Sequence, residues 1–139
     1  MNVDTSVTVA AVIACVLLLA VVFGASFLRF RPRPLKTVYF QKKWQEAQAL
    51  CKDKTTWPLA VINADKLLDE ALKKRRYRGK TVGERMVSAQ RAMTDNDGAW
   101  FGHKLRNRLV HEEVKLKEPD VKKALLGLRQ ALKDLGALK

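Results

Sequence analysis

Cysteine and histidine are scarce in this chain of 139 residues, which has two of each. Cys15 lies inside a long apolar run and Cys51 lies in the charged remainder, so no intrachain disulfide is expected. His103 and His111 are the only histidines, and together with Cys51 they cannot complete a zinc site. We therefore expect no metal ion and no cofactor.

The sequence also lacks the patterns of β-structure and of a phosphate-binding loop. No segment alternates apolar and polar residues with a period of two, and no hairpin turn joins β-branched runs. The stretch Arg78-Gly79-Lys80-Thr81 ends like a phosphate-binding loop but has no earlier glycine and no preceding strand. We interpret it as a turn between helices, and we expect an all-α protein without internal repeats or low-complexity segments.

Charged residues are absent from Thr5 to Leu28. A helix over residues 7–28 would be about 33 Å long, enough to cross a bilayer core of about 30 Å. A buried helix of a soluble domain rarely runs this long without a polar face. A cleaved signal needs a basic start and an apolar run of only about 7–15 residues, whereas the only charge before this run is Asp4. We predict a transmembrane helix over residues 7–28, preceded by a short extracytoplasmic N-terminus, residues 1–6.

Basic residues flank this apolar run on one side only. Arg29, Arg31, Arg33 and Lys36 follow it, and no Lys or Arg precedes it. Because basic flanks stay on the cytoplasmic side, we expect the N-terminus outside and the rest of the chain in the cytoplasm. Residues 29–36 form a basic juxtamembrane linker that its two prolines stiffen. The short chain, this orientation and the lack of sorting signals indicate a bacterial inner membrane.

The remainder, residues 37–139, is predicted to be a cytoplasmic bundle of four to five helices. Thr56 is expected to cap the second helix, and Thr81 with Glu84 has the spacing of a capping box for the third. The fifth helix shows an apolar seam with spacings of four, three, four and three. The expected helices are 37–53, Thr56 to about Tyr77, Thr81 to about Met93, about Ala99 to His111, and a last one from Pro119 with the seam Val121, Leu125, Leu128, Leu132 and Leu135.

Acidic residues are too few to balance the bases of this part of the chain. All 27 Lys and Arg residues but only 13 of the 14 Asp and Glu residues follow residue 28, so its formal charge is 27 − 13 = +14. An anionic membrane surface would favour such a charge by about 1 kcal/mol per basic residue. RNA or DNA would favour it equally, so both partners stay open. The expected contacts are Arg29, Arg31, Arg33, Lys73, Lys74, Arg75, Arg76, Arg78 and Lys80.

One stretch carries a possible catalytic motif. Arg106-Asn107, three intervening residues and His111 resemble the signature of HEPN domains (higher eukaryotes and prokaryotes nucleotide-binding), which are small helical bundles. The resemblance covers roughly residues 37–137. It implies a metal-independent ribonuclease, or a relative that only binds RNA or nucleotides, with a homodimer bringing two motifs together. His111 would transfer a proton, Arg106 would stabilise phosphate charge and Asn107 would orient them.

Helical geometry leaves a structural alternative open for the same residues. On one ideal helix Asn107 and His111 are about 40° apart, whereas Arg106 and His111 are about 140° apart. Arg106 and His111 meet only if the helix ends or bends near Val110, or across a dimer. Otherwise Asn107 bonds His111 across one turn, and Arg106 pairs with a carboxylate of a neighbouring helix.

Three functions are therefore compatible with the sequence. The first is a membrane-anchored basic module that binds RNA, anionic lipid or a protein partner. The second is a membrane-tethered ribonuclease that uses Arg106, Asn107 and His111. The third is a structural assembly protein, although the small residues Gly24, Ala25 and Ser26 do not form a repeated helix-packing pattern.

Overall fold

The computed structural model describes residues 3–29 and 32–139 and divides the chain into two compact units, Met1–Pro32 and Arg33–Lys139. The first unit is helix α1, Val3–Arg29. It is long and apolar enough to cross a membrane, and none of its described side chains is buried. The helix covers the whole predicted span 7–28 and continues beyond it at both ends. Arg31 of the predicted linker lies outside the described residues.

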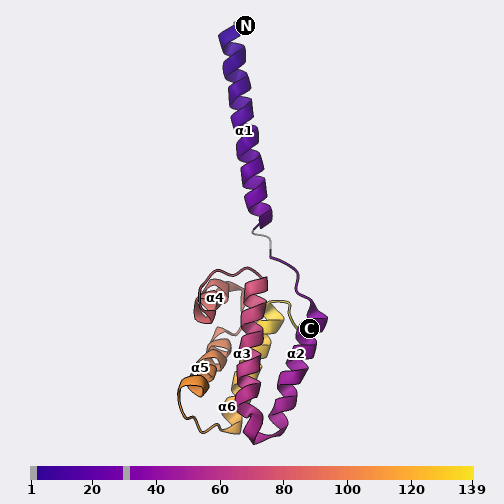
Figure 1. Ribbon diagram of the computed structural model, residues 1–139, viewed down its shortest axis with the longest axis vertical. Coiled ribbons are helices and arrows are strands. Elements are labelled where there is room, and N and C mark those ends of the chain that lie inside the picture. Colours follow the sequence, from indigo (N-terminus) through magenta and orange to yellow (C-terminus); the bar gives the residue numbers. More distant parts are fainter. Residues whose placement is uncertain (1–2, 30–31) are drawn as a thin grey trace. The chain divides into compact units, whose positions relative to one another are not determined.

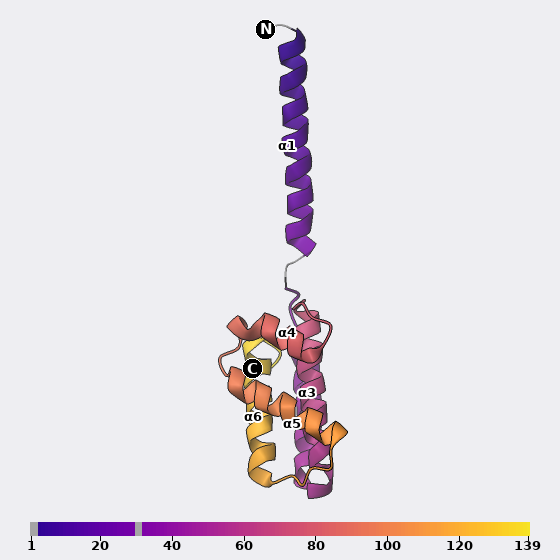
Figure 2. The ribbon, with the colours of Figure 1, turned by 90° about the vertical axis from the view of Figure 1, so that its left-hand side faces the viewer.

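Residues 33–139, all described, form the predicted helical bundle (Figure 1). Helix α3 lies at its centre and packs against α2, α4, α5 and α6, and α5 packs closely along α6 (Figure 2). The described residues contain no β-strand, so the all-α prediction is confirmed for them. The elements are α2 Thr37–Ala49, η1 Leu50–Lys52, η2 Lys54–Thr56, α3 Trp57–Lys74, α4 Val82–Ala89, η3 Gln90–Ala92, α5 Asn96–His111 and α6 Glu118–Asp134.

The core follows the predicted apolar stripes with one main exception. Phe40, Leu68, Leu72, Met86 and Leu132 are fully buried in the main cluster, where α2, α3, α4 and α6 meet. A second cluster joins the start of α3 to α5 and α6 and includes Trp57, Val61, Leu105, Val121 and Ala124. Of the predicted seam, only Leu125 is partly buried rather than buried; it packs against both clusters and also lines a cavity.

Side-chain caps set two of the helix starts. Thr81 caps α4 by accepting the N–H of Glu84 at 3.2 Å, as predicted, and the Glu84 carboxylate accepts the N–H of Lys80 at 2.6 Å. Helix α5 begins at Asn96 rather than Ala99, because the Asp95 carboxylate accepts the N–H of Gly98 at 2.8 Å. The connection between the helices expected to end near Met93 and to start near Ala99 is therefore shorter than predicted.

The connection from α2 to α3 differs from the prediction. Helix α2 ends at Ala49 rather than near Asp53, and two short 3₁₀ turns follow it. Thr56 does not cap α3 with its side chain. Its hydroxyl instead donates to the carbonyls of Leu50 and Asp53, and Asp53 caps the second 3₁₀ turn by accepting the N–H of Thr55. Thr56 thus satisfies carbonyls left over by the end of α2.

Helices α3 and α6 end in the same type of turn. After α3, Arg76 N–H donates to the Lys73 carbonyl and Tyr77 N–H to the Leu72 carbonyl. After α6, Gly136 N–H donates to Lys133 and Ala137 N–H to Leu132, which is the same pair of bonds. Such a turn needs a left-handed residue, usually glycine. Gly136 supplies it at φ 74°, but at the end of α3 the left-handed residue is Arg76, at φ 65°.

The carboxylate of Asp134 fastens the end of α6 to the loop before α5. It accepts the N–H and hydroxyl of Thr94 at 2.7 and 2.8 Å and the amide of Gln130 at 2.8 Å. Partial burial raises the pKa of Asp134, but these hydrogen bonds outweigh it and hold the pKa below its usual value. The ionised form is therefore the one that the fold stabilises.

We expect Asp134→Asn to destabilise the bundle by about 1 kcal/mol at pH 7 and to have little effect near pH 3. The folded pKa lies below the unfolded one, so the stabilisation is complete above about pH 4 and is lost as the pH falls through the folded pKa. Urea unfolding of residues 33–139 at both pH values measures the difference. Glu113→Gln, at an exposed carboxylate, is the control; an Asp134→Asn effect that persists undiminished at low pH contradicts the assignment.

Candidate functional site

The motif residues Arg106 and Asn107 lie on α5, which runs unbroken to His111. Leu105 is buried in the core, and this fixes the rotation of α5 against α3. As a result, Arg106 reaches across to Asp65 in the middle of α3, with its Nε 3.6 Å from Asp65 Oδ2. Asp65 is only 1% exposed, so Arg106 pairs with a buried carboxylate from a neighbouring helix.

Asp65 and His103 complete a ring with the two motif residues, made of three hydrogen bonds and the Arg106–Asp65 ion pair. His103 Nδ1 lies 2.9 Å from Asp65 Oδ1, and His103 Nε2 lies 3.3 Å from Asn107 Nδ2. Asn107 Oδ1 accepts from Arg106 Nη1 at 3.0 Å. We call these four side chains the Asp65 ring.

The donors of the Asp65 ring define its protonation. The Arg106 guanidinium can only donate, so it must face the amide oxygen of Asn107. The amide nitrogen of Asn107 then faces His103 and donates to Nε2, which leaves the proton of a neutral imidazole on Nδ1. That proton is donated to Asp65 Oδ1, and the Arg106 guanidinium lies beside the other oxygen of the same carboxylate. Every polar group of the ring has a partner of the right kind.

His111 does not join this ring. It is the last residue of α5, its side chain is exposed, and it forms no hydrogen bond with any residue that the structure describes. Asn107 instead bonds the histidine one turn earlier, His103, whose ring also packs edge-on against Trp100 with centroids 5.8 Å apart. Of the three predicted residues, the fold thus brings together Arg106 and Asn107 but leaves His111 apart from them within one chain.

The chemistry open to the Asp65 ring is limited by its saturation. His103 is 8% exposed and both of its ring nitrogens are engaged, so it has no free nitrogen for proton transfer to a substrate. The Arg106 side chain is one-third exposed, and Asn107 is also partly exposed. The ring therefore fastens α5 to α3, and Arg106 is its one group placed to meet a phosphate.

Sequence reasoning missed Asp65 and His103, although signals for both are present. Asp65 stands four residues after Val61 and three before Leu68, so it shares their buried stripe on α3. An acidic residue in such a stripe requires a buried partner. His103 stands four residues before Asn107, the same helical spacing as His111 after it.

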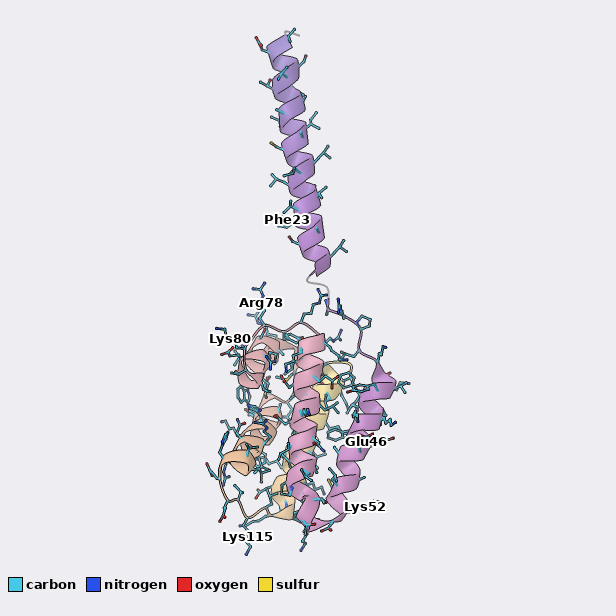
Figure 3. All side chains as sticks on the ribbon, in the orientation of Figure 1. Phe23, Glu46, Lys52, Arg78, Lys80 and Lys115 are labelled. Carbon is cyan, nitrogen blue, oxygen red and sulfur yellow. The ribbon has the colours of Figure 1, made fainter. Side chains whose placement is uncertain are left out.

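The basic residues predicted to contact an anionic partner separate into two groups. Lys73 pairs with Asp69 at 2.7 Å, Lys74 pairs with Glu70 at 3.2 Å, and Arg75 Nε donates to the Leu135 carbonyl at 2.8 Å. These three residues serve the bundle itself. Arg33, Arg76, Arg78 and Lys80 are exposed, as are Lys73 and Lys74, and Figure 3 shows Arg78 and Lys80. Arg31 and the side chain of Arg29 lie outside the described residues.

Arg85 is a basic residue that the sequence did not single out. It is 6% exposed, and its guanidinium bonds Asp69 at 2.6 and 2.7 Å and the Gly79 carbonyl at 2.8 Å. It thereby fastens α4 and the preceding turn to α3. The spacing of Thr81 and Glu84 predicts where α4 starts, but it does not predict the buried ion pair between Arg85 and Asp69.

Comparisons of the chain with protein-family models, with curated proteins and with solved structures found no match. The HEPN-like resemblance therefore stays a prediction based on Arg106, Asn107 and His111. Among the described residues, no group of three His, Cys, Asp or Glu side chains is placed to hold a metal ion.

Proposed function

We propose that this chain is a single-pass membrane protein whose basic cytoplasmic bundle binds anionic phospholipid headgroups. Helix α1 supports the anchor, since its length and apolarity suit a bilayer. The basic flank after it supports the orientation with the bundle in the cytoplasm. Lipid is favoured over RNA because a group of exposed basic residues lies at the end of the bundle to which the linker leads.

Five exposed bases lie at the end of the bundle where the chain enters it, and other exposed bases are spread over the rest of its surface. The start of α2, the end of α3 and α4 share this end in Figures 1 and 2. Leu35, Tyr77 and Val82 pack there against the same core cluster. We call Arg33, Lys36, Arg76, Arg78 and Lys80 the basic end; Figure 3 shows Arg78 and Lys80 on it, and Lys52 and Lys115 at the opposite end.

The length of the linker sets an upper limit on the distance between the anchor and the bundle. Residues 30–36 join α1 to α2, and seven residues span at most about 25 Å. With α1 in a bilayer, a linker of this length allows the basic end to reach the headgroups, where charges act over about 10 Å at moderate salt. Each Lys or Arg at an anionic surface gains about 1 kcal/mol.

Arg76 is the observation that carries the proposal. Its left-handed backbone, at φ 65°, costs a residue with a Cβ about 1 kcal/mol, and glycine fills the equivalent position after α6. The Arg76 side chain is exposed and forms no ion pair or hydrogen bond with a described residue, so no such bond offsets this cost. A base held at a glycine position points to a role outside the bundle.

Removing three charges from the basic end should release the bundle from anionic vesicles. We expect Arg76→Gln, Arg78→Gln and Lys80→Gln together to weaken binding of residues 33–139 to phosphatidylglycerol-containing vesicles by about 100-fold at low salt. The matched control removes three charges from the other end, as Lys52→Gln, Lys115→Gln and Lys117→Gln. Vesicle sedimentation measures both, with phosphatidylcholine vesicles as the blank. If both triple variants lose the same vesicle affinity, binding depends only on the net charge of the bundle, and the proposal is refuted.

Arg76→Gly distinguishes the effect of the arginine charge on vesicle binding from the effect of the left-handed backbone on stability. Glycine relieves the left-handed strain, so this variant should be more stable to urea by about 1 kcal/mol while binding the same vesicles several-fold more weakly. Opposite changes in stability and binding are the expected signature. A variant that binds as well as the parent would remove the reason for an arginine at this position.

A ribonuclease is the second candidate, favoured by the exposed His111 and the part-exposed Arg106 on one helix. Because the two do not meet within one chain, this function needs a dimer. Incubation of residues 33–139 with an RNA pool in EDTA tests it, beside Arg106→Ala and His111→Ala. Cleavage that both substitutions abolish would support the ribonuclease and refute the lipid-binding proposal. If RNA is bound but not cleaved, and is bound more tightly than the vesicles, the basic end binds nucleic acid instead.

A further inference from the structure

A cavity of about 400 Å³ lies between the end of α2, the start of α3 and α6. Its volume falls within the range of about 300–1,000 Å³ that is typical of small-ligand sites. Its walls are mainly apolar and include two of the three tryptophans of the chain. The apolar lining residues are Trp44, Cys51, Trp57, Val121, Leu125 and Leu126.

Trp44 contributes an unused hydrogen-bond donor to this wall. Its side chain is 3% exposed, and its buried Nε1 has no acceptor among the described residues. The indole of Trp57, in contrast, donates to the Cys51 carbonyl at 3.0 Å. Buried polar groups almost always have a partner, so the Trp44 N–H calls for an acceptor that the described residues do not provide.

The polar rim of the cavity favours an anion. Lys122 and Arg129 line it from α6 and are exposed, and neither forms an ion pair with a residue that the structure describes. They stand seven residues apart, about two helical turns, and so project from the same face of α6. Glu118 is the only acidic residue among those that line it. Burial raises the pKa of the Cys51 thiol, which keeps that wall group neutral at physiological pH.

We propose that this cavity binds a single-chain carboxylate of the medium-chain fatty acid type. The carboxylate accepts from Trp44 Nε1 and pairs with Arg129, and the hydrocarbon chain lies against the indoles and the leucines of α6. A carboxylate gives Trp44 its missing acceptor and pairs with the basic rim, and an unbranched tail suits the apolar side chains that make up most of the lining. The site shares no residue with the basic end and does not depend on the proposed function.

Tryptophan fluorescence of the full chain in phosphatidylcholine nanodiscs tests this site directly. All three tryptophans lie in the bundle, and Trp100→Phe leaves Trp44 and Trp57 as reporters in the cavity wall. Decanoate is the probe. Decanol, with the same chain and no charge, controls for partition of the tail into the nanodisc. We expect a saturable fluorescence change with decanoate, and at least a tenfold weaker one with decanol.

Two substitutions connect the response to the proposed contacts. Arg129→Gln should raise the decanoate concentration for half-saturation at least tenfold, whereas Arg91→Gln, at an exposed arginine outside the cavity, should not change it. Trp44→Phe keeps the ring but removes the donor, and should weaken binding as read by Trp57. A non-saturable response, an equal response to decanol, or one that Arg129→Gln leaves unchanged in a variant with parental melting temperature would overturn the proposal.

Discussion

Gly127→Ala should cost the bundle about 3 kcal/mol or more, a large part of the roughly 5–15 kcal/mol that stabilises a domain of this size. A Cβ at Gly127 would lie 2.1 Å from the carbonyl carbon and 2.2 Å from the carbonyl oxygen of Gly98. Both atoms belong to the backbone of α5, which cannot rotate away as a side chain could. Helices α5 and α6 would have to separate, and the buried contacts between them would be lost.

Urea unfolding of residues 33–139 measures this effect, because all core residues lie within that range. Gly83→Ala is the matched control. Its Cβ would meet the edge of the Trp100 ring at 3.3 Å and would lie 4.0 Å from His103 Nε2, which is ordinary contact. Alanine is also the better helix former, so the change should stay within about 1 kcal/mol. Similar stabilities for the two variants would show that α5 and α6 do not cross at Gly98 and Gly127.

Asp65→Ala should be the most damaging substitution of a polar residue, with a loss of about 3–5 kcal/mol. Without Asp65, the buried His103 loses the acceptor for its Nδ1 proton and Arg106 loses its counter-charge. Asp65→Asn keeps an acceptor for His103 but no charge for Arg106, so we expect a smaller loss. Glu113→Ala, at an exposed carboxylate, should change the stability by no more than about 0.5 kcal/mol.

A double-mutant cycle separates the Asp65–His103 pair from the effect of burial alone. If the pair is direct, Asp65→Ala and His103→Ala together should cost about 1–3 kcal/mol less than the sum of the single losses. Additive losses would mean that the two side chains do not interact. Urea unfolding at neutral pH gives all four stabilities.

The helices were predictable because their signals are local. The periodicity of apolar residues placed α3 and α6, and the spacing of Thr81 and Glu84 placed the start of α4. The cap of α5 was also within reach, since Asp95 and Gly98 have the spacing of a capping pair. It was missed because the run of Asp, Asn and Gly around it is equally typical of a loop.

The candidate site was only half predictable. Arg106 and Asn107 were identified, but the histidine that Asn107 bonds is His103 rather than His111. Spacing along one helix cannot choose between them, because both stand four residues from Asn107. The choice is made by Asp65, which comes from α3 and is 38 residues from His103 in the sequence.

The sequence by itself determined the apolar segment long enough to cross a membrane, the all-α class and the excess of basic charge after residue 28, because each depends only on composition and on neighbours a few positions away. Tertiary packing decided the rest. It alone set which bases pair within the bundle and which, like Arg76, face outward, and it alone brought Trp44, Trp57 and Arg129 to one cavity. Those outcomes depend on how helices distant in the sequence are rotated and spaced against one another, and the close approach of α5 and α6 at Gly98 and Gly127 is part of what sets that geometry.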